Sequence, residues 1–134
     1  ERMVYYNRCK MYIKQGNFEK AEEGYLKTIE MDDKDPEGYY YLAKMHVQQN
    51  KHFKAVRNFS KAIERMEAGL DYYISDDYGD EIPLNAVYLE RGKLYELVEE
   101  YELMCEDYRK ACALSNCKNP FPEGKQKVYE QYCK

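Results

Sequence analysis

The sequence repeats its residue types at an interval of 34 residues. Laying Glu1–Lys34 over Asp35–Ala68 brings residues of the same kind together at many positions. The matched pairs include Tyr5 with Tyr39, Cys9 with Ala43, Tyr12 with His46, Ala21 with Ala55, Tyr25 with Phe59, and Ile29 with Ile63. A third copy follows 49 residues later, beginning at Tyr88. An internal period of this length is typical of helical repeat arrays, in which each unit buries its apolar face by stacking on its neighbours.

Each copy has the same order of residue types on its first predicted helix. The leading Tyr is followed four residues later by a small residue, which is Cys9, Ala43 or Gly92, and a ring stands three residues further on. These positions share one face of a helix, and the small residue lets the second helix of the unit approach closely. Over about residues 3–118 this order resembles the tetratricopeptide repeat family, whose units are helix-turn-helix hairpins. Met104 stands where a small residue is usual, so we expect looser or shifted packing in the third unit.

The resemblance implies an all-α fold, a right-handed superhelical stack of three helix-turn-helix repeats with a C-terminal capping helix. We expect a single domain over residues 1–134, with repeats at about 2–35, 36–69 and 85–118, an insertion at 70–84 and a cap at about 123–133. The expected helices are Arg2–Gln15, Phe18–Met31, Glu37–Gln49, His52–Ser75, Leu84–Glu99, Tyr101–Leu114 and Lys125–Cys133. The second-repeat helix that begins at His52 is extended, because helical apolar spacing continues through Leu70, Tyr73 and Ile74.

A second stripe of side chains begins one residue after the leading aromatic of each copy, about 100° around the helix. Lys occupies the same place in every copy, as Lys10, Lys44 and Lys93. In the tetratricopeptide family this face lines a concave groove, so the resemblance implies a groove for an extended or helical partner segment, acidic and with apolar neighbours. The expected partner-binding residues are Tyr6, Lys10, Ile13, Tyr40, Tyr41, Lys44, Val47, Leu89 and Lys93. The alternative is that these Lys residues only solvate exposed helices.

The sequence predicts a non-catalytic module that binds proteins or peptides. It contains no Gly-rich phosphate loop and no Ser-centred nucleophile motif, and we expect no enzyme activity, cofactor or metal. Two alternatives stay open: a structural self-assembly module that forms a homodimer, or an accessory domain of a larger enzyme or envelope protein. Some family members clamp the acidic C-termini of chaperones. We do not expect that mode here, because the matching places hold Tyr6, Lys10, Tyr41, Ala86 and Glu90.

Charge and hydropathy restrict the partners. The net charge of −4 disfavours nucleic acid, and no apolar run is long enough for membrane insertion. The compartment is not determined, although the cytoplasm is slightly favoured. Because the chain begins at Glu1, we interpret it as a fragment or a processed form. Acidic residues concentrate in the insertion at Asp71–Glu81, which either competes internally for the groove or forms a solvated loop.

The chain contains five Cys residues and no C-x-x-C pair. Cys9 is expected to fill space in the core. Cys117 and Cys133 flank the tail and have two interpretations: a disulfide that pins the capping helix, worth about 3 kcal/mol, or free thiols in a reducing compartment. The spacing of the Cys and His residues disfavours a zinc site.

Overall fold

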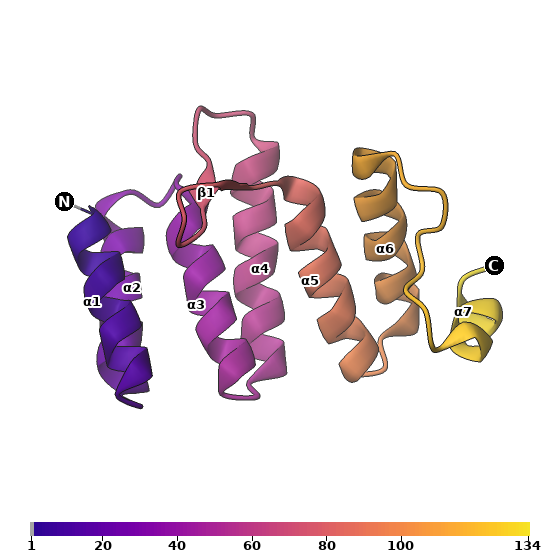
Figure 1. The fold of residues 1–134 in the computed structure, drawn as a ribbon, viewed down its shortest axis with the longest axis horizontal. Coiled ribbons are helices and arrows are strands. Elements are labelled where there is room, and N and C mark those ends of the chain that lie inside the picture. Colours follow the sequence, from indigo (N-terminus) through magenta and orange to yellow (C-terminus); the bar gives the residue numbers. More distant parts are fainter. Residues whose placement is uncertain (1) are drawn as a thin grey trace.

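The computed structural model describes residues 2–134, and its helices follow one another along a curved row of antiparallel pairs (Figure 1). Helices α1 and α2, α3 and α4, and α5 and α6 form three hairpins, and α2 against α3 and α4 against α5 join them. The expected stack of three helix-turn-helix repeats is confirmed. The helices are α1 (Arg2–Lys14), α2 (Phe18–Met31), α3 (Pro36–Gln48), α4 (His52–Glu67), α5 (Leu84–Leu97), α6 (Tyr101–Ser115) and α7 (Gln126–Tyr132).

The turn inside each repeat has the same backbone geometry. In each turn one residue adopts a positive φ: Gly16 at 75°, Asn50 at 60° and Glu99 at 61°. The residue after it donates its N–H to a carbonyl five residues earlier, at 2.8 Å in all three repeats. This bond satisfies a carbonyl left free at the helix end. Glu99 forms the same turn, although a residue with a side chain costs about 1 kcal/mol in this left-handed backbone conformation.

Small residues bring the helices of each hairpin together, as the repeat pattern predicts. Ala43 is fully buried. A Cβ on Gly92 would lie 2.7 Å from the ring of Tyr108, so α5 and α6 are in close contact there. Met104 is fully buried in one cluster with Tyr129. The prediction of looser packing in the third repeat is therefore wrong, because the larger side chain fills the space between α6 and the capping helix.

The fourth helix is shorter than predicted. Helix α4 ends at Glu67, and Gly69 follows with a φ of 73°, which turns the chain away from the helix axis. Residues Ile74–Ser75 (β1) and Glu81–Ile82 (β2) instead pair as an antiparallel hairpin, in which Ile74 faces Ile82. Ile74 is fully buried in the main core. The extended helix near Leu70–Ile74 was one face considered for packing on another copy in the self-assembly alternative, and this segment is not helical.

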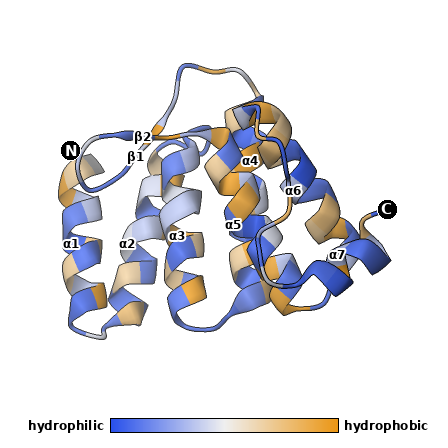
Figure 2. Cartoon of the chain, turned by 45° about the vertical axis from the view of Figure 1, so that its right-hand side comes forward, coloured by the Kyte–Doolittle hydropathy of each residue, from blue (hydrophilic) through white to orange (hydrophobic). Residues whose placement is uncertain are grey.

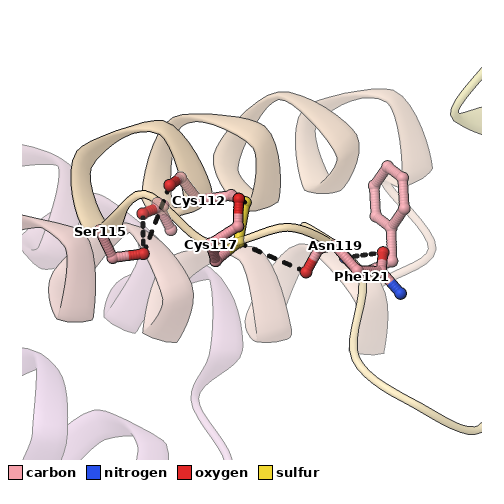
Figure 3. Close-up of a disulfide and its surroundings, with 6 residues drawn as sticks. Cys112, Ser115, Cys117, Asn119 and Phe121 are labelled. Atoms are coloured by element: carbon pink, nitrogen blue, oxygen red, sulfur yellow. Dashed lines mark hydrogen bonds between the residues drawn. A yellow bond between two sulfur atoms is a disulfide. The ribbon is translucent and has the colours of Figure 1, made fainter.

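Two disulfides fix the C-terminal end, with partners that differ from the expected pair. Cys133 bonds to Cys105 of α6, whose Cα lies 5.4 Å away, and both residues are buried. Cys117 bonds to Cys112 instead, because the left-handed conformation of Asn116 folds the chain back on the end of α6 (Figure 3). Cys9 is free and buried, as expected of a core residue.

A carboxylate also holds the capping helix in place. Glu96, near the end of α5, accepts hydrogen bonds from the hydroxyls of Tyr108 and Tyr129, both at 3.0 Å, and pairs with Lys125 at 3.0 Å. Burial raises the pKa of Glu96, but these three bonds outweigh it and lower the pKa overall. Residues of α5, α6 and α7 therefore meet at one ionised side chain.

Candidate functional site

The predicted binding stripe divides into a buried part and an exposed part. Tyr6 and Tyr40 are buried, at 6% and 5% exposure, and support the surface from below. Tyr41 is half-buried, and its ring centroid lies 5.8 Å from that of Tyr6 and 5.2 Å from that of Tyr40. The Nζ of Lys10 lies 5.0 Å from the Tyr41 centroid. The structure thus gathers these four predicted residues from α1 and α3 into one cluster.

The other predicted residues lie further along the helices. Lys44 and Val47 are exposed on α3, and Ile13 is half-buried on α1. Lys93 is exposed on α5, and within residues 2–134 it forms no ion pair.

Leu89 belongs to a different surface. It lines a separate hollow of about 260 Å³ with Ala111 and the loop around Phe121, beside the Cys112–Cys117 disulfide. The structure does not bring Leu89 to the cluster around Lys10.

The insertion occupies the upper part of this face, as Figure 2 shows for the mostly hydrophilic chain that reaches over α3 toward α1. The backbone N–H of Ser75 donates to Glu37 at 2.8 Å, and the hydroxyl of Tyr41 donates to the Ser75 carbonyl. Beyond it, the carboxylate of Asp77 accepts from Lys10. Side chains of α1 and α3 therefore bind the backbone N–H and C=O of Ser75 and the carboxylate of Asp77.

Glu37 is part of the site, yet the repeat pattern did not identify it. It lies in the first turn of α3, where an acidic residue is favoured by the helix dipole alone. Its spacing of four residues from Tyr41 places both on one helix face, and that spacing was the available signal.

Two hollows lie on either side of the Lys10–Asp77 pair. The smaller, of about 140 Å³, lies beneath the hairpin and is lined by Tyr6, Tyr41 and Ser75 among others. The larger and more open one measures about 560 Å³. Its lining residues are Asn7, Lys10, Met11, Ile13, Lys14 and Asp77. The open hollow combines two ammonium groups and one carboxylate with apolar side chains.

Two lysines of the site, Lys10 and Lys44, form ion pairs. The hydrogen bond and charge of Lys10, with a further contribution from Lys14, lower the pKa of Asp77. Burial, together with the carboxylates of Glu37 and Asp77, raises the pKa of Tyr41, so its hydroxyl remains a donor at neutral pH. Lys44 pairs with Glu90 of α5 at 2.8 Å. Both lysine pairs are partly exposed to solvent.

The described part of the chain offers no cluster of three or more His, Cys, Asp or Glu side chains that fits a metal ion. None of the helices in residues 2–134 has the length and apolar character needed to cross a membrane.

Comparison with known proteins agrees with the repeat geometry. A family model described as tetratricopeptide repeat matches residues 4–35 and 86–116. No curated protein matches the sequence.

Several solved structures share the fold. The N-terminal domain of stress-induced protein-1 from C. elegans has a TM-score of 0.71 at 22% identity, covering 96% of this chain and 92% of that one. The first TPR of Spaghetti (RPAP3), bound to the HSP90 peptide SRMEEVD, has a TM-score of 0.71 at 16% identity, covering 99% and 94%. The second TPR domain of human RPAP3, in complex with the HSP70 peptide SGPTIEEVD, has a TM-score of 0.63 at 15% identity, covering 100% and 99%.

Proposed function

This chain belongs to the tetratricopeptide repeat family, and we propose that it is a non-catalytic module that binds an extended, acidic segment of a partner protein. The proposed binding surface is the face formed by α1, α3 and α5. Lys10, Lys44 and Lys93 supply the positive charge, and Ile13 and Val47 supply the apolar contacts. Tyr6, Tyr40 and Tyr41 support the surface from within the core.

The observation that carries this proposal is the way the face holds the chain's own Ser75–Asp77 segment. Recognition of an extended chain requires partners for its backbone N–H and C=O, and Glu37 and Tyr41 provide both at Ser75. Recognition of acidic sequence requires a cation at the right distance along the segment, and Lys10 provides one for Asp77. Lys10 and the open hollow beside it, whose lining includes no residue of the strands β1 and β2, are suited to a partner segment of the same acidic chemistry.

The lysine pairs do not prevent such binding. Ion pairs between partly exposed side chains contribute about 0–1 kcal/mol, because water solvates the separated charges well. Exchange of Asp77, whose side chain is 69% exposed, for a carboxylate of a partner therefore costs little. Lys93 needs no exchange.

Two of the similar structures hold peptides that end in EEVD, so this fold accommodates acidic segments in those proteins. The likeness supports an acidic partner for this chain. It does not carry over the chaperone-tail mode, because the clamp positions hold Tyr6, Lys10, Tyr41, Ala86 and Glu90.

The two disulfides bear on the compartment. Disulfides form and persist in oxidising surroundings such as secreted and periplasmic spaces. Cys105–Cys133 and Cys112–Cys117 therefore favour an oxidising compartment over the cytoplasm.

An array of acidic peptides that contain Tyr or Leu tests the proposal. The parent chain is expected to bind members of the array, more weakly as salt is raised from about 0.05 to 0.5 M, because exposed charges are screened over that range. The triple variant Lys10→Glu, Lys44→Glu, Lys93→Glu is expected to lose this binding while circular dichroism shows an unchanged helical fold.

A matched control carries the same charge change away from the face. Lys27→Glu, Lys54→Glu and Lys127→Glu alter exposed residues of α2, α4 and α7, and this variant is expected to bind like the parent apart from a small loss from its net charge. Equal loss in both triple variants, or binding that survives Lys10→Glu, Lys44→Glu, Lys93→Glu, contradicts the proposed surface.

A further inference from the structure

The hairpin has a firmly held stem and a lightly held tip. In the stem, Ile74 is fully buried in the main core, and Ile82 packs against the same core. Ser75 bonds to Glu37 and to Tyr41. The stem therefore belongs to the folded body.

The tip, residues 76–80, is ordered by its own bonds. The carboxylate of Asp76 accepts from the backbone N–H groups of Tyr78, at 2.8 Å, and Asp80, at 2.9 Å. The Asp76 N–H donates to the Asp80 carbonyl at 2.8 Å. Because these bonds are internal, the tip keeps its shape whether or not it contacts the helices.

The tip meets the helices through Asp77. Its side chain is 69% exposed, and that of Lys10 is 30% exposed. Tyr78, next to it, is 91% exposed. A bond between side chains that are this accessible is weak and open to competition, whereas the buried stem is not.

We propose that the hairpin tip is a built-in competitor, in which Asp77 occupies Lys10 until an acidic segment of the partner takes its place while the stem stays docked. This inference rests on the proposed function of the face. It adds that the free site is partly self-blocked, and that the first step of partner binding is exchange of one carboxylate for another on Lys10. The open hollow beside Asp77, with Ile13 and Lys14 in its lining, receives the rest of the segment.

The expected strength of the self-block follows from its exposure. An exposed ion pair lowers the apparent affinity of a competing carboxylate by up to about fivefold, which corresponds to about 1 kcal/mol. Removal of the tip carboxylate should therefore tighten partner binding by a few-fold.

Fluorescence anisotropy with a labelled acidic peptide tests this mechanism. The probe has the sequence of residues 75–82, Ser-Asp-Asp-Tyr-Gly-Asp-Glu-Ile, and is added to the full chain. Asp77→Asn keeps the side-chain shape and removes the charge, and we expect it to bind the probe up to about fivefold more tightly than the parent. Asp80→Asn makes the same charge change within the tip without touching Lys10, and we expect parental affinity. In a Lys10→Gln background, Asp77→Asn should have no effect.

The outcomes separate the two proposals. Binding to the parent with no gain in Asp77→Asn, or with an equal gain in Asp80→Asn, overturns the self-block and leaves the binding function standing. Binding to Asp77→Asn but not to the parent supports the self-block. Absence of binding to every variant, together with an array in which no acidic peptide binds, overturns the binding function and the self-block together.

Discussion

Removal of the Cys105–Cys133 disulfide should be the most destabilising change at the C-terminal end. The double variant Cys105→Ala, Cys133→Ala opens a loop with a sequence separation of 28 residues. In the chain-entropy description, closing such a loop restricts the unfolded chain by about 3.5 kcal/mol. For a chain of this length we expect the melting temperature to fall by roughly 10–14 °C, at about 3–4 °C for each kcal/mol.

The second disulfide is a matched control of the same chemistry. Cys112 and Cys117 are 5 residues apart, so the same relation gives only about 2 kcal/mol, or roughly 6–8 °C, for Cys112→Ala, Cys117→Ala. The two double variants lose the same atoms and differ chiefly in loop length and in burial. The difference between their losses in melting temperature thus measures how much the covalent link between the capping helix and α6 stabilises the fold.

Thermal unfolding followed by circular dichroism provides the comparison, and peptide mapping without reductant identifies the bonded pairs. A map that links Cys117 to Cys133, or a smaller loss for the Cys105–Cys133 variant than for the Cys112–Cys117 variant, would refute the reasoning. Treatment of the parent with a reductant should lower its melting temperature by at least as much as the larger single-pair effect.

Two further changes test the packing around the third repeat. Gly92→Ala places a methyl group against the buried ring of Tyr108, and the overpacking should cost about 2–3 kcal/mol. This cost exceeds the gain in helix propensity of about 1 kcal/mol, so urea unfolding should show a net loss of stability of about 1–2 kcal/mol. A more stable variant would show that α5 and α6 are not in close contact. Glu96→Gln weakens the bonds from Tyr108, Tyr129 and Lys125. Because the pKa of Glu96 in the folded chain lies below its unfolded value of about 4.5, the stability that Glu96 contributes is complete above that pH and is lost as the pH falls through the folded pKa. The free energy of unfolding, measured against pH, should therefore fall less steeply in acid for Glu96→Gln than for the parent. An equal slope in both proteins would show that Glu96 is unimportant.

The repeat pattern predicted the helices well because it reflects contacts that recur. Six expected helices begin and end within two residues of the observed bounds, and the turn bond beneath Gly16, Asn50 and Glu99 is the same in each repeat. The pattern even held where Glu99 replaced a residue better suited to positive φ. Because the same contact recurs in all three repeats, the pattern of residue types remains recognisable even where one repeat carries an unfavourable residue.

The insertion was predicted poorly because it occurs once. Leu70, Tyr73 and Ile74 have the i, i+3, i+4 spacing of a helix, but strands of two residues are too short to show their own period. Gly69 was the signal that the helix ends earlier. The Cys105–Cys133 pair was missed for a related reason, since it depends on where α7 docks on α6. The Cys112–Cys117 pair depends instead on the left-handed conformation of Asn116 at the end of α6.

Positions that are equivalent in the sequence are not equivalent in the site. Lys10, Lys44 and Lys93 share one place in the repeat, yet residues outside the repeat pattern give each a different environment. Lys10 pairs with Asp77 of the insertion, Lys44 pairs with Glu90 of the next repeat, and Lys93 forms no ion pair within the described residues. On the proposed binding face the positive charge is therefore graded along the row of helices. Because the proposal requires exchange with an internal carboxylate at two of the three positions, we expect these unrepeated acidic residues, and not the repeated lysines, to set the direction in which a partner lies across α1, α3 and α5.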